Sequence, residues 1–415
     1  MIQKPRTVRR WVGAMATVLA FVAADVVAQD DQPDPAPTEA PAPPPSEPAP
    51  PKAPTPAPED RLRFSIDFGR WIAQPTGLEF EPASVIDPLD PSGTSIEDLD
   101  FGTESDARYG FGVDLGHGNG GFEMMWWSSE SLQEASASRP ANFLYGELLA
   151  FPDLAGYGND GLADGYASTA ETQIREWRID YYRPAFESSR VSGRWFVGYR
   201  DVTHGRTIEA EYFAFEPLLP PLFPPFIPMA RPDLNPLPDT ALVSSEFKGR
   251  GLEGGLYVTV PLIANKRLSV EGGFALAALR GDMETDYRSS NAYYVQTDRL
   301  GNRTILNPPY TQFDDVLPGP PVVYVVDSIQ QEVLSIGVAT EGRSTSASVV
   351  EVELGMRWRY WKTFELFGGF RSSRYDDVGV DLRPAGPTGA NRQALVEEPR
   401  SVTYEGFFVG MTLGF

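Results

Sequence analysis

Charged residues recur at every second position in several segments of the chain. In residues 350–360, Glu351, Glu353, Arg357 and Arg359 alternate with apolar residues. Residues two apart on a β-strand share a face, so these charges would line one side of a sheet and the apolar residues the other. Rings of charge around a lumen control the passage of ions. The same pattern marks these candidate lumen-lining residues: Arg178, Arg194, Arg200, Glu253, Glu271, Glu351, Glu353, Arg357, Arg359, Glu365 and Arg371.

These lining charges have two interpretations. Buried unpaired charge is costly, so arginines and carboxylates in a narrow lumen are expected to pair across it and fill it. In a wider lumen they would instead border a water-filled path. About eight strands leave room only for side chains and sixteen to eighteen leave a true channel, so a strand count between these limits leaves both interpretations open.

An acidic segment lies between the first two strands predicted below. Residues 74–107 contain acidic side chains and no basic one, and Glu97, Asp98, Asp100, Glu104 and Asp106 form its densest part. Like charges at a confined mouth raise the local concentration of cations. The segment therefore indicates an acidic vestibule, or divalent-ion bridging to an anionic surface glycolipid, with a solvated loop as the plain alternative.

Metal and cofactor chemistry have weak support. Asn159, Asp160 and Asp164 lie close together in a glycine-rich stretch. Calcium takes six to eight oxygen ligands, and this patch supplies only a few, so a turn cluster explains it more simply than a calcium site. We expect neither a bound metal nor a cofactor.

An enzymatic function has little support as well. The chain has two histidines, of which His204 lies near Asp201. An Asp/His pair occurs in some outer-membrane proteases, but no second acidic pair accompanies this one. No Ser/His/acid spacing for nucleophilic catalysis is recognisable. We therefore expect a protein that is not an enzyme.

The elements that must carry the lining charges are membrane-crossing strands. Apolar side chains occupy every second position of the final segment, and the chain stops on an aromatic one: Phe407, Val409, Met411, Leu413 and Phe415. This pattern resembles the terminal signal of bacterial outer-membrane barrels. Ten such strands, joined alternately by short turns and long segments, predict an all-β, antiparallel up-and-down transmembrane β-barrel with long extracellular loops.

The strand count has an alternative. Both termini on the periplasmic side require an even number, and ten is the expected one. The long segment 281–345 contains further β-like runs at 293–295, 322–326 and 333–338, so twelve is the alternative.

Residues 1–28 have the basic start, apolar run and small-residue end of a secretory signal peptide. Residues 29–60 are rich in proline and predict an extended periplasmic linker that reaches toward the cell wall. Residues 61–415 form the predicted barrel, located in the bacterial outer membrane among its lipids. The net charge of −22 argues against nucleic acid as a partner.

Short fragments of the barrel segment resemble a known family. Four pieces are similar in sequence and in order to the pore-forming family of the Legionella-type major outer-membrane protein. They lie at 193–200, 247–252, 272–281 and 404–408, and the first reads Gly193-Arg194-Trp195-Phe196-Val197-Gly198-Tyr199-Arg200. The resemblance implies a porin-like barrel and transfers no catalytic residue.

The sequence thus favours passive diffusion of small hydrophilic solutes or ions, with cations preferred. The alternative is a plugged structural or adhesive barrel whose long loops bind an external partner.

Overall fold

The computed structural model describes the barrel segment with several gaps. It covers residues 62–78, 83–87, 90–96, 104–116, 118–138, 143–146, 162–163, 165–188, 190–213, 238–263, 267–298, 301, 303–306, 326–384 and 395–415. The predicted signal peptide (1–28) and linker (29–60) lie outside these residues. Residues Pro58–Phe415 form one compact unit. Within the described part, no helix is long and apolar enough to cross a membrane.

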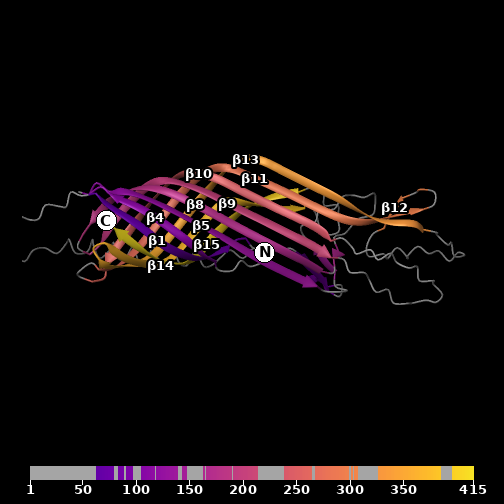
Figure 1. Cartoon of the computed structure of the whole chain (residues 1–415), viewed down its shortest axis with the longest axis horizontal. Coiled ribbons are helices and arrows are strands. Elements are labelled where there is room, and N and C mark those ends of the chain that lie inside the picture. The colour runs from indigo at the N-terminus through magenta and orange to yellow at the C-terminus, as the bar shows by residue number, and fades with distance from the viewer. Residues whose placement is uncertain are drawn as a thin grey trace, which may run out of the picture. The chain divides into compact units, whose positions relative to one another are not determined.

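Ten antiparallel strands form a closed ring (Figure 1). Each pairs with its neighbour along the chain, and the first pairs with the last. In ring order they are β1 (Arg63–Thr76), β4 (Glu104–Asp114), β5 (Gly121–Ser138), β8 (Gly165–Glu187), β9 (Ser192–Phe213), β10 (Asp239–Pro261), β11 (Leu268–Asp298), β13 (Val326–Trp361), β14 (Phe364–Pro384) and β15 (Leu395–Gly414).

The final residue takes part in closing the ring. Phe415 donates its backbone N–H to the carbonyl of Phe64 at 2.9 Å and accepts the N–H of Phe64 at 3.3 Å. Closure matters because an open sheet edge in lipid would leave backbone groups without partners. The predicted barrel class and the count of ten are confirmed.

The alternative count of twelve is wrong for a specific reason. The β-like runs at 293–295 and 333–338 belong to β11 and β13, which have 31 and 36 residues and pair with each other along their length. The run at 322–326 lies outside the described residues except for its last residue. These runs therefore lengthen two strands instead of adding new ones.

Short turns join the strands at the end of the barrel that also carries both of its termini. They cover 115–120, 188–191, 262–267 and 362–363, and the predicted alternation of short turns with long connections is confirmed. In the first of them Gly116, Gly118 and Gly120 all have positive φ, which a side chain would disfavour.

Additional strands lie in the long connections at the opposite end. β2 (Ala83–Asp87), β3 (Asp90–Ile96), β6 (Phe143–Gly146) and β7 (Leu162–Ala163) make a separate four-stranded sheet. β12 (Arg303–Leu306) pairs with β11, beyond the ends of the other ring strands (Figure 1).

An apolar belt surrounds the half of the barrel nearest the short turns. Along β10 and into the turn that follows it, the outward positions from Leu252 to Leu262 carry apolar side chains or glycine. They span about 33 Å of chain and roughly 25 Å of height at a tilt near 40°. Aromatic side chains lie near both edges, with Trp358 and Tyr360 at one and Trp126 and Tyr109 at the other. The belt matches the apolar band of an outer-membrane barrel, and this chain is a bacterial outer-membrane β-barrel protein.

Beyond the belt the two faces of the strands exchange character. On β11, Leu279, Met283 and Tyr287 point inward and are buried, while Arg280 and Glu284 point outward and are exposed. The strands therefore continue well past the membrane, with water outside and an apolar core inside. The period-two pattern of the lipid-facing positions places the long connections at about 128–172, 201–246 and 281–345. These bounds are too wide, because much of each segment belongs to a strand.

Candidate functional site

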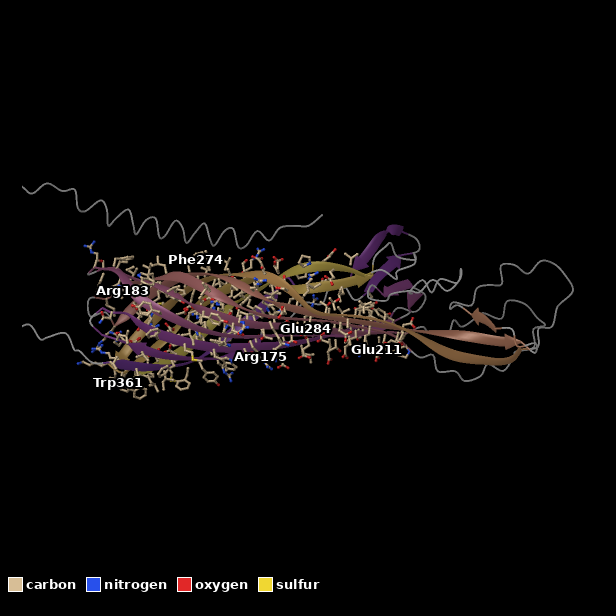
Figure 2. All side chains as sticks on the ribbon, turned by 90° about the horizontal axis from the view of Figure 1, so that it is seen from above. Arg175, Arg183, Glu211, Phe274, Glu284 and Trp361 are labelled. Atoms are coloured by element: carbon tan, nitrogen blue, oxygen red, sulfur yellow. The ribbon has the colours of Figure 1, made fainter. Side chains whose placement is uncertain are left out.

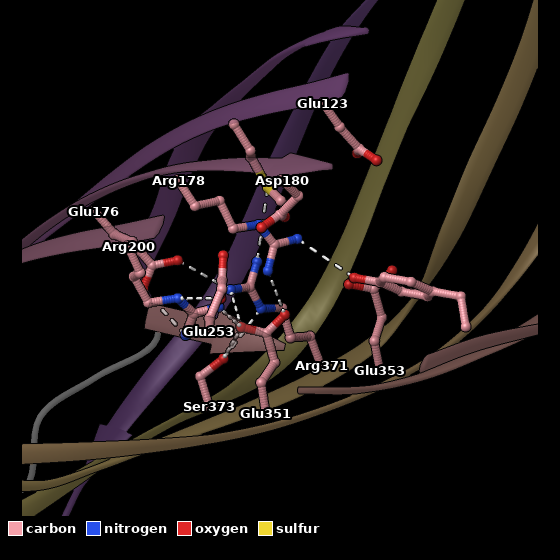
Figure 3. Close-up of polar contacts among 12 residues, drawn as sticks. Glu123, Glu176, Arg178, Asp180, Arg200, Glu253, Glu351, Glu353, Arg371 and Ser373 are labelled. Atoms are coloured by element: carbon pink, nitrogen blue, oxygen red, sulfur yellow. Dashed lines mark hydrogen bonds and ion pairs between the residues drawn. The ribbon is translucent and has the colours of Figure 1, made fainter. Parts of the chain in front are cut away.

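A cluster of charged side chains crosses the lumen at the outer part of the belt (Figure 3). We call it the lumen network, and its residues come from five strands. Its members are Glu176, Arg178 and Asp180 on β8, Arg200 on β9, Glu253 on β10, Glu351 on β13 and Arg371 on β14. Each of the seven is at most 5% exposed.

Glu351 lies at the centre of this network. Its Oε1 lies 3.1 Å from Arg178 Nη1, and its Oε2 lies 2.9 Å from Arg200 Nη2 and 2.6 Å from Arg371 Nη2. One carboxylate therefore joins three arginines from three different strands, a charge-assisted arrangement that fixes all four side chains.

The second carboxylate of the network, Glu176, completes the crossing. It accepts a hydrogen bond from the Tyr375 hydroxyl at 2.6 Å and lies 3.5 Å from Arg371 Nη2. β8 and β14 are five strands apart in both directions around the ring. The contact between Glu176 and Arg371 consequently joins opposite sides of the barrel.

On the outer side of the lumen network, aromatic rings pack against Arg371. The Arg371 guanidinium lies 4.7 Å from the ring centre of Trp71 and 5.8 Å from that of Trp127. These two indoles contact each other edge to face at 4.6 Å, and Tyr404 packs against both. Above them the lumen is filled by a hydrophobic core that includes Ile174, Val202, Phe247, Val349 and Val402.

On the short-turn side of the lumen network, the charged side chains that face the lumen are more exposed to solvent. Arg194 lies between the rings of Tyr182 and Tyr257, at 5.0 and 4.9 Å, and 3.5 Å from Glu123. Its side chain keeps 35% of its exposure and that of Glu123 keeps 23%. Solvent therefore reaches this part of the lumen, around Arg194 and Glu123, which we call the periplasmic chamber.

A second group of ion pairs borders the periplasmic chamber. Arg357 lies 3.1 Å from Glu271 and 3.0 Å from Glu365, which also pairs with Arg359. Their side chains range from 15% to 55% exposed, so water screens these pairs more than those of the lumen network.

The eleven predicted lining residues thus fall into two groups. Five of them, Arg178, Arg200, Glu253, Glu351 and Arg371, belong to the lumen network. Six of them, Arg194, Glu271, Glu353, Arg357, Arg359 and Glu365, lie in or at the rim of the periplasmic chamber.

Sequence reasoning missed the aromatic partners of the lumen network. Trp71, Trp127 and Tyr375 were not singled out, although each continues the inward positions of its strand. That alternation was the signal that would have found them.

The acidic vestibule is only partly described. Glu97, Asp98 and Asp100 lie outside the described residues, as do the calcium candidates Asn159, Asp160 and Asp164. Glu104 and Asp106 do not lie in a loop as predicted, because both belong to β4. Asp106 is half-buried and pairs in register with the inward residue Trp71. In the described part of the chain, no group of three or more His, Cys, Asp or Glu side chains could hold a metal ion.

His204 does not form a pair with Asp201. It is fully buried inside the outer half of the barrel, beyond the belt, where Thr172 Oγ1 lies 3.5 Å from its Nε2. Asp201, three positions away on β9, faces the opposite side of the strand. Burial lowers the pKa of His204 to about 4, with the Arg206 guanidinium acting in the same direction. The histidine is a neutral core residue here.

The chain is similar to solved structures of outer-membrane proteins, and the similarity is low. No protein-family model matches the chain, and no curated protein sequence does. Similar solved structures include the outer membrane protease OmpT from Escherichia coli, with 9% identity, a TM-score of 0.40, and coverage of 86% of this chain and 97% of that one. The Pseudomonas putida toluene transporter TodX has 7% identity, a TM-score of 0.21 and coverage of 86% and 89%.

An anion-selective porin from Comamonas acidovorans is also similar, with 11% identity, a TM-score of 0.14 and coverage of 86% of this chain and 99% of that one. Likenesses at this level assign neither a family nor a function to the chain.

Proposed function

We propose that this protein is a closed outer-membrane barrel that carries an extracellular β-structure for contact with an external partner. The observation that supports this most directly is Glu351, which joins Arg178, Arg200 and Arg371 across the lumen while all four side chains are buried. A path for hydrated ions would need water at this level.

The packing beyond the network supports the same proposal. The hydrophobic core fills the lumen of the outer half, where Val202, Phe247 and Tyr375 have no exposed surface. Solutes would have to displace both the ion pairs and this core. The long outer strands, with charged side chains facing water, are consistent with a rigid platform that presents the long connections.

Passive diffusion with a preference for cations is the second candidate. The partly exposed ion pairs of the periplasmic chamber favour it, because they resemble a charged entrance, and so does the likeness to the Legionella-type pore-forming family. It requires the lumen network to open. The seven side chains of the network hold four carboxyl groups and three guanidinium groups, and this excess of acid is the basis for preferring cations.

Single-channel recording in planar bilayers separates the two candidates. We expect the full-length protein to give no stepwise current, whereas an open porin in the same bilayers conducts. Folding and insertion are checked on the same preparation by protection of the belt from protease in vesicles. Reproducible current steps with a cation-selective reversal potential would refute the closed-barrel proposal.

A further inference from the structure

Three arginines face outward just beyond the apolar belt, on three of the four consecutive strands β8 to β11. Arg175 on β8, Arg250 on β10 and Arg280 on β11 are all exposed. Each is two positions outside a belt residue on the same face, namely Trp177, Leu252 and Ala278 respectively. Along the barrel, Figure 2 shows Arg175 between Phe274, which lies in the belt, and the outer residues Glu284 and Glu211.

Two of these arginines oppose each other directly. Arg250 and Arg280 are register partners on the antiparallel pair β10–β11, and both point away from the lumen. Like charges at directly opposed positions destabilise a sheet. The arrangement becomes favourable when an anion lies between the two guanidinium groups.

Nearby acids do not neutralise the three arginines. Asp201 is the register partner of Arg250 and the only acid in that row. In the described part of the chain, Arg175 and Arg280 form no ion pair. Lys248, in the next row, is already paired with Glu246 at 2.7 Å. Asp282, two positions beyond Arg280 on the same face of β11, is the register partner of Lys248. The two rows that hold the three arginines therefore carry four basic side chains, with Lys248, against Asp201 and Asp282, which leaves a local excess of positive charge.

The spacing fits a headgroup with two phosphates. Arg250 and Arg280 are on adjacent strands, about 5 Å apart, which suits one phosphate between them. Arg175 lies two strands from Arg250 and one pair of residues farther out, roughly 12 Å away. A single phosphate cannot reach all three arginines, and the belt below them offers apolar surface to acyl chains.

We propose that Arg175, Arg250 and Arg280 form a binding site for a bis-phosphorylated glycolipid of the outer leaflet. Arg250 and Arg280 hold one phosphate, Arg175 holds the other, and the acyl chains lie along Trp177, Leu252 and Ala278. The same residues would anchor the barrel at a fixed depth, because the phosphates mark the membrane surface. This site is independent of whether the lumen conducts.

Native mass spectrometry of the full-length protein in detergent tests the site directly. The probe is a bis-phosphorylated lipid A glycolipid, and its dephosphorylated form is the chemical control. The triple variant Arg175→Gln, Arg250→Gln, Arg280→Gln should bind the phosphorylated lipid on the order of a hundredfold more weakly, at about fivefold for each arginine. Wild-type affinity should also fall as salt is raised.

The matched control is Arg288→Gln. Arg288 is exposed on the same face of β11, eight positions farther from the belt, and pairs with Asp286 at 2.7 Å. It should leave lipid binding unchanged. Salt dependence is measured on the wild-type protein, so a folding defect of the triple variant would not remove the test.

Three results would overturn the proposal. They are equal binding by the triple variant and the wild type, equal binding of the dephosphorylated lipid, and binding that does not respond to salt. Inorganic phosphate that competes at the affinity of the lipid would identify a site for free phosphate instead, and would equally overturn it.

Discussion

Replacing Glu351 with glutamine removes the central negative charge of the lumen network without changing its shape. Arg200 would keep Glu253 at 2.8 Å, and Arg178 would keep Asp180 at 3.6 Å. Arg371 would lose its partner at 2.6 Å and retain only Glu176 at 3.5 Å. Removing one partner of a buried ion pair costs about 3–5 kcal/mol. Because each arginine keeps one acid, we expect the low end, about 3 kcal/mol of unfolding free energy.

Equilibrium unfolding in phospholipid vesicles measures this loss. Urea titration followed by tryptophan fluorescence reports on the lumen, because Trp71 and Trp127 pack against Arg371. Glu365→Gln is the matched control, an acid that pairs with two arginines in the periplasmic chamber but remains 15% exposed. It should cost about 1 kcal/mol, because its partners Arg357 and Arg359 are 28% and 55% exposed and water can solvate them once the charge of Glu365 is removed.

A double variant identifies the source of the cost. If the loss arises from a buried arginine left short of negative charge, then Arg371→Met added to Glu351→Gln should restore part of the stability. A Glu351→Gln protein within 1 kcal/mol of the wild type would show that the lumen network is hydrated, and the reasoning for a closed barrel would fail.

Two further predictions test other parts of the barrel. Leu354→Arg, in the middle of the lipid-facing belt on β13, should lower the unfolding free energy by about 2–4 kcal/mol, whereas Ser344→Arg on the same face beyond the belt should change it by less than about 0.5 kcal/mol in the same urea titration. His204 binds its proton less readily in the folded state than in the unfolded one, so stability should fall by up to about 3 kcal/mol as pH drops from 6.5 toward 4. His204→Gln should reduce the slope by that contribution, and an unchanged slope in the variant would show that other groups account for it.

The belt could be predicted from the sequence because lipid leaves a strong signal. Val350, Val352, Leu354 and Met356 face hydrocarbon on one side while Glu351 and Glu353 face the lumen, so the period of two is unbroken. The closing strand and the short turns followed from the same pattern. The pairing of the lining charges was foreseen as one of two interpretations, but which acid meets which arginine depends on the register of strands far apart in sequence.

The extracellular half of the barrel escaped sequence reasoning because its pattern is inverted. On β9, Val202, Ile208 and Ala210 point inward, and Thr203 and Glu209 point outward. A search for lipid-facing apolar positions therefore interprets such a segment as a loop. The same alternation, taken as a strand with water outside, would have predicted the continuation past the membrane.

The inversion explains why a charged network and an apolar core occupy one lumen. Beyond the membrane the outer face meets water, so burial of apolar side chains can stabilise the barrel only from the inside. Within the belt the outer face is already apolar, and an apolar inner face would make each strand a continuous apolar run. Runs of that kind are recognised as membrane helices once they are long enough, so a barrel strand needs polar inner positions. Those polar groups must then find partners across a ten-stranded lumen, which is what Glu351 and its three arginines do.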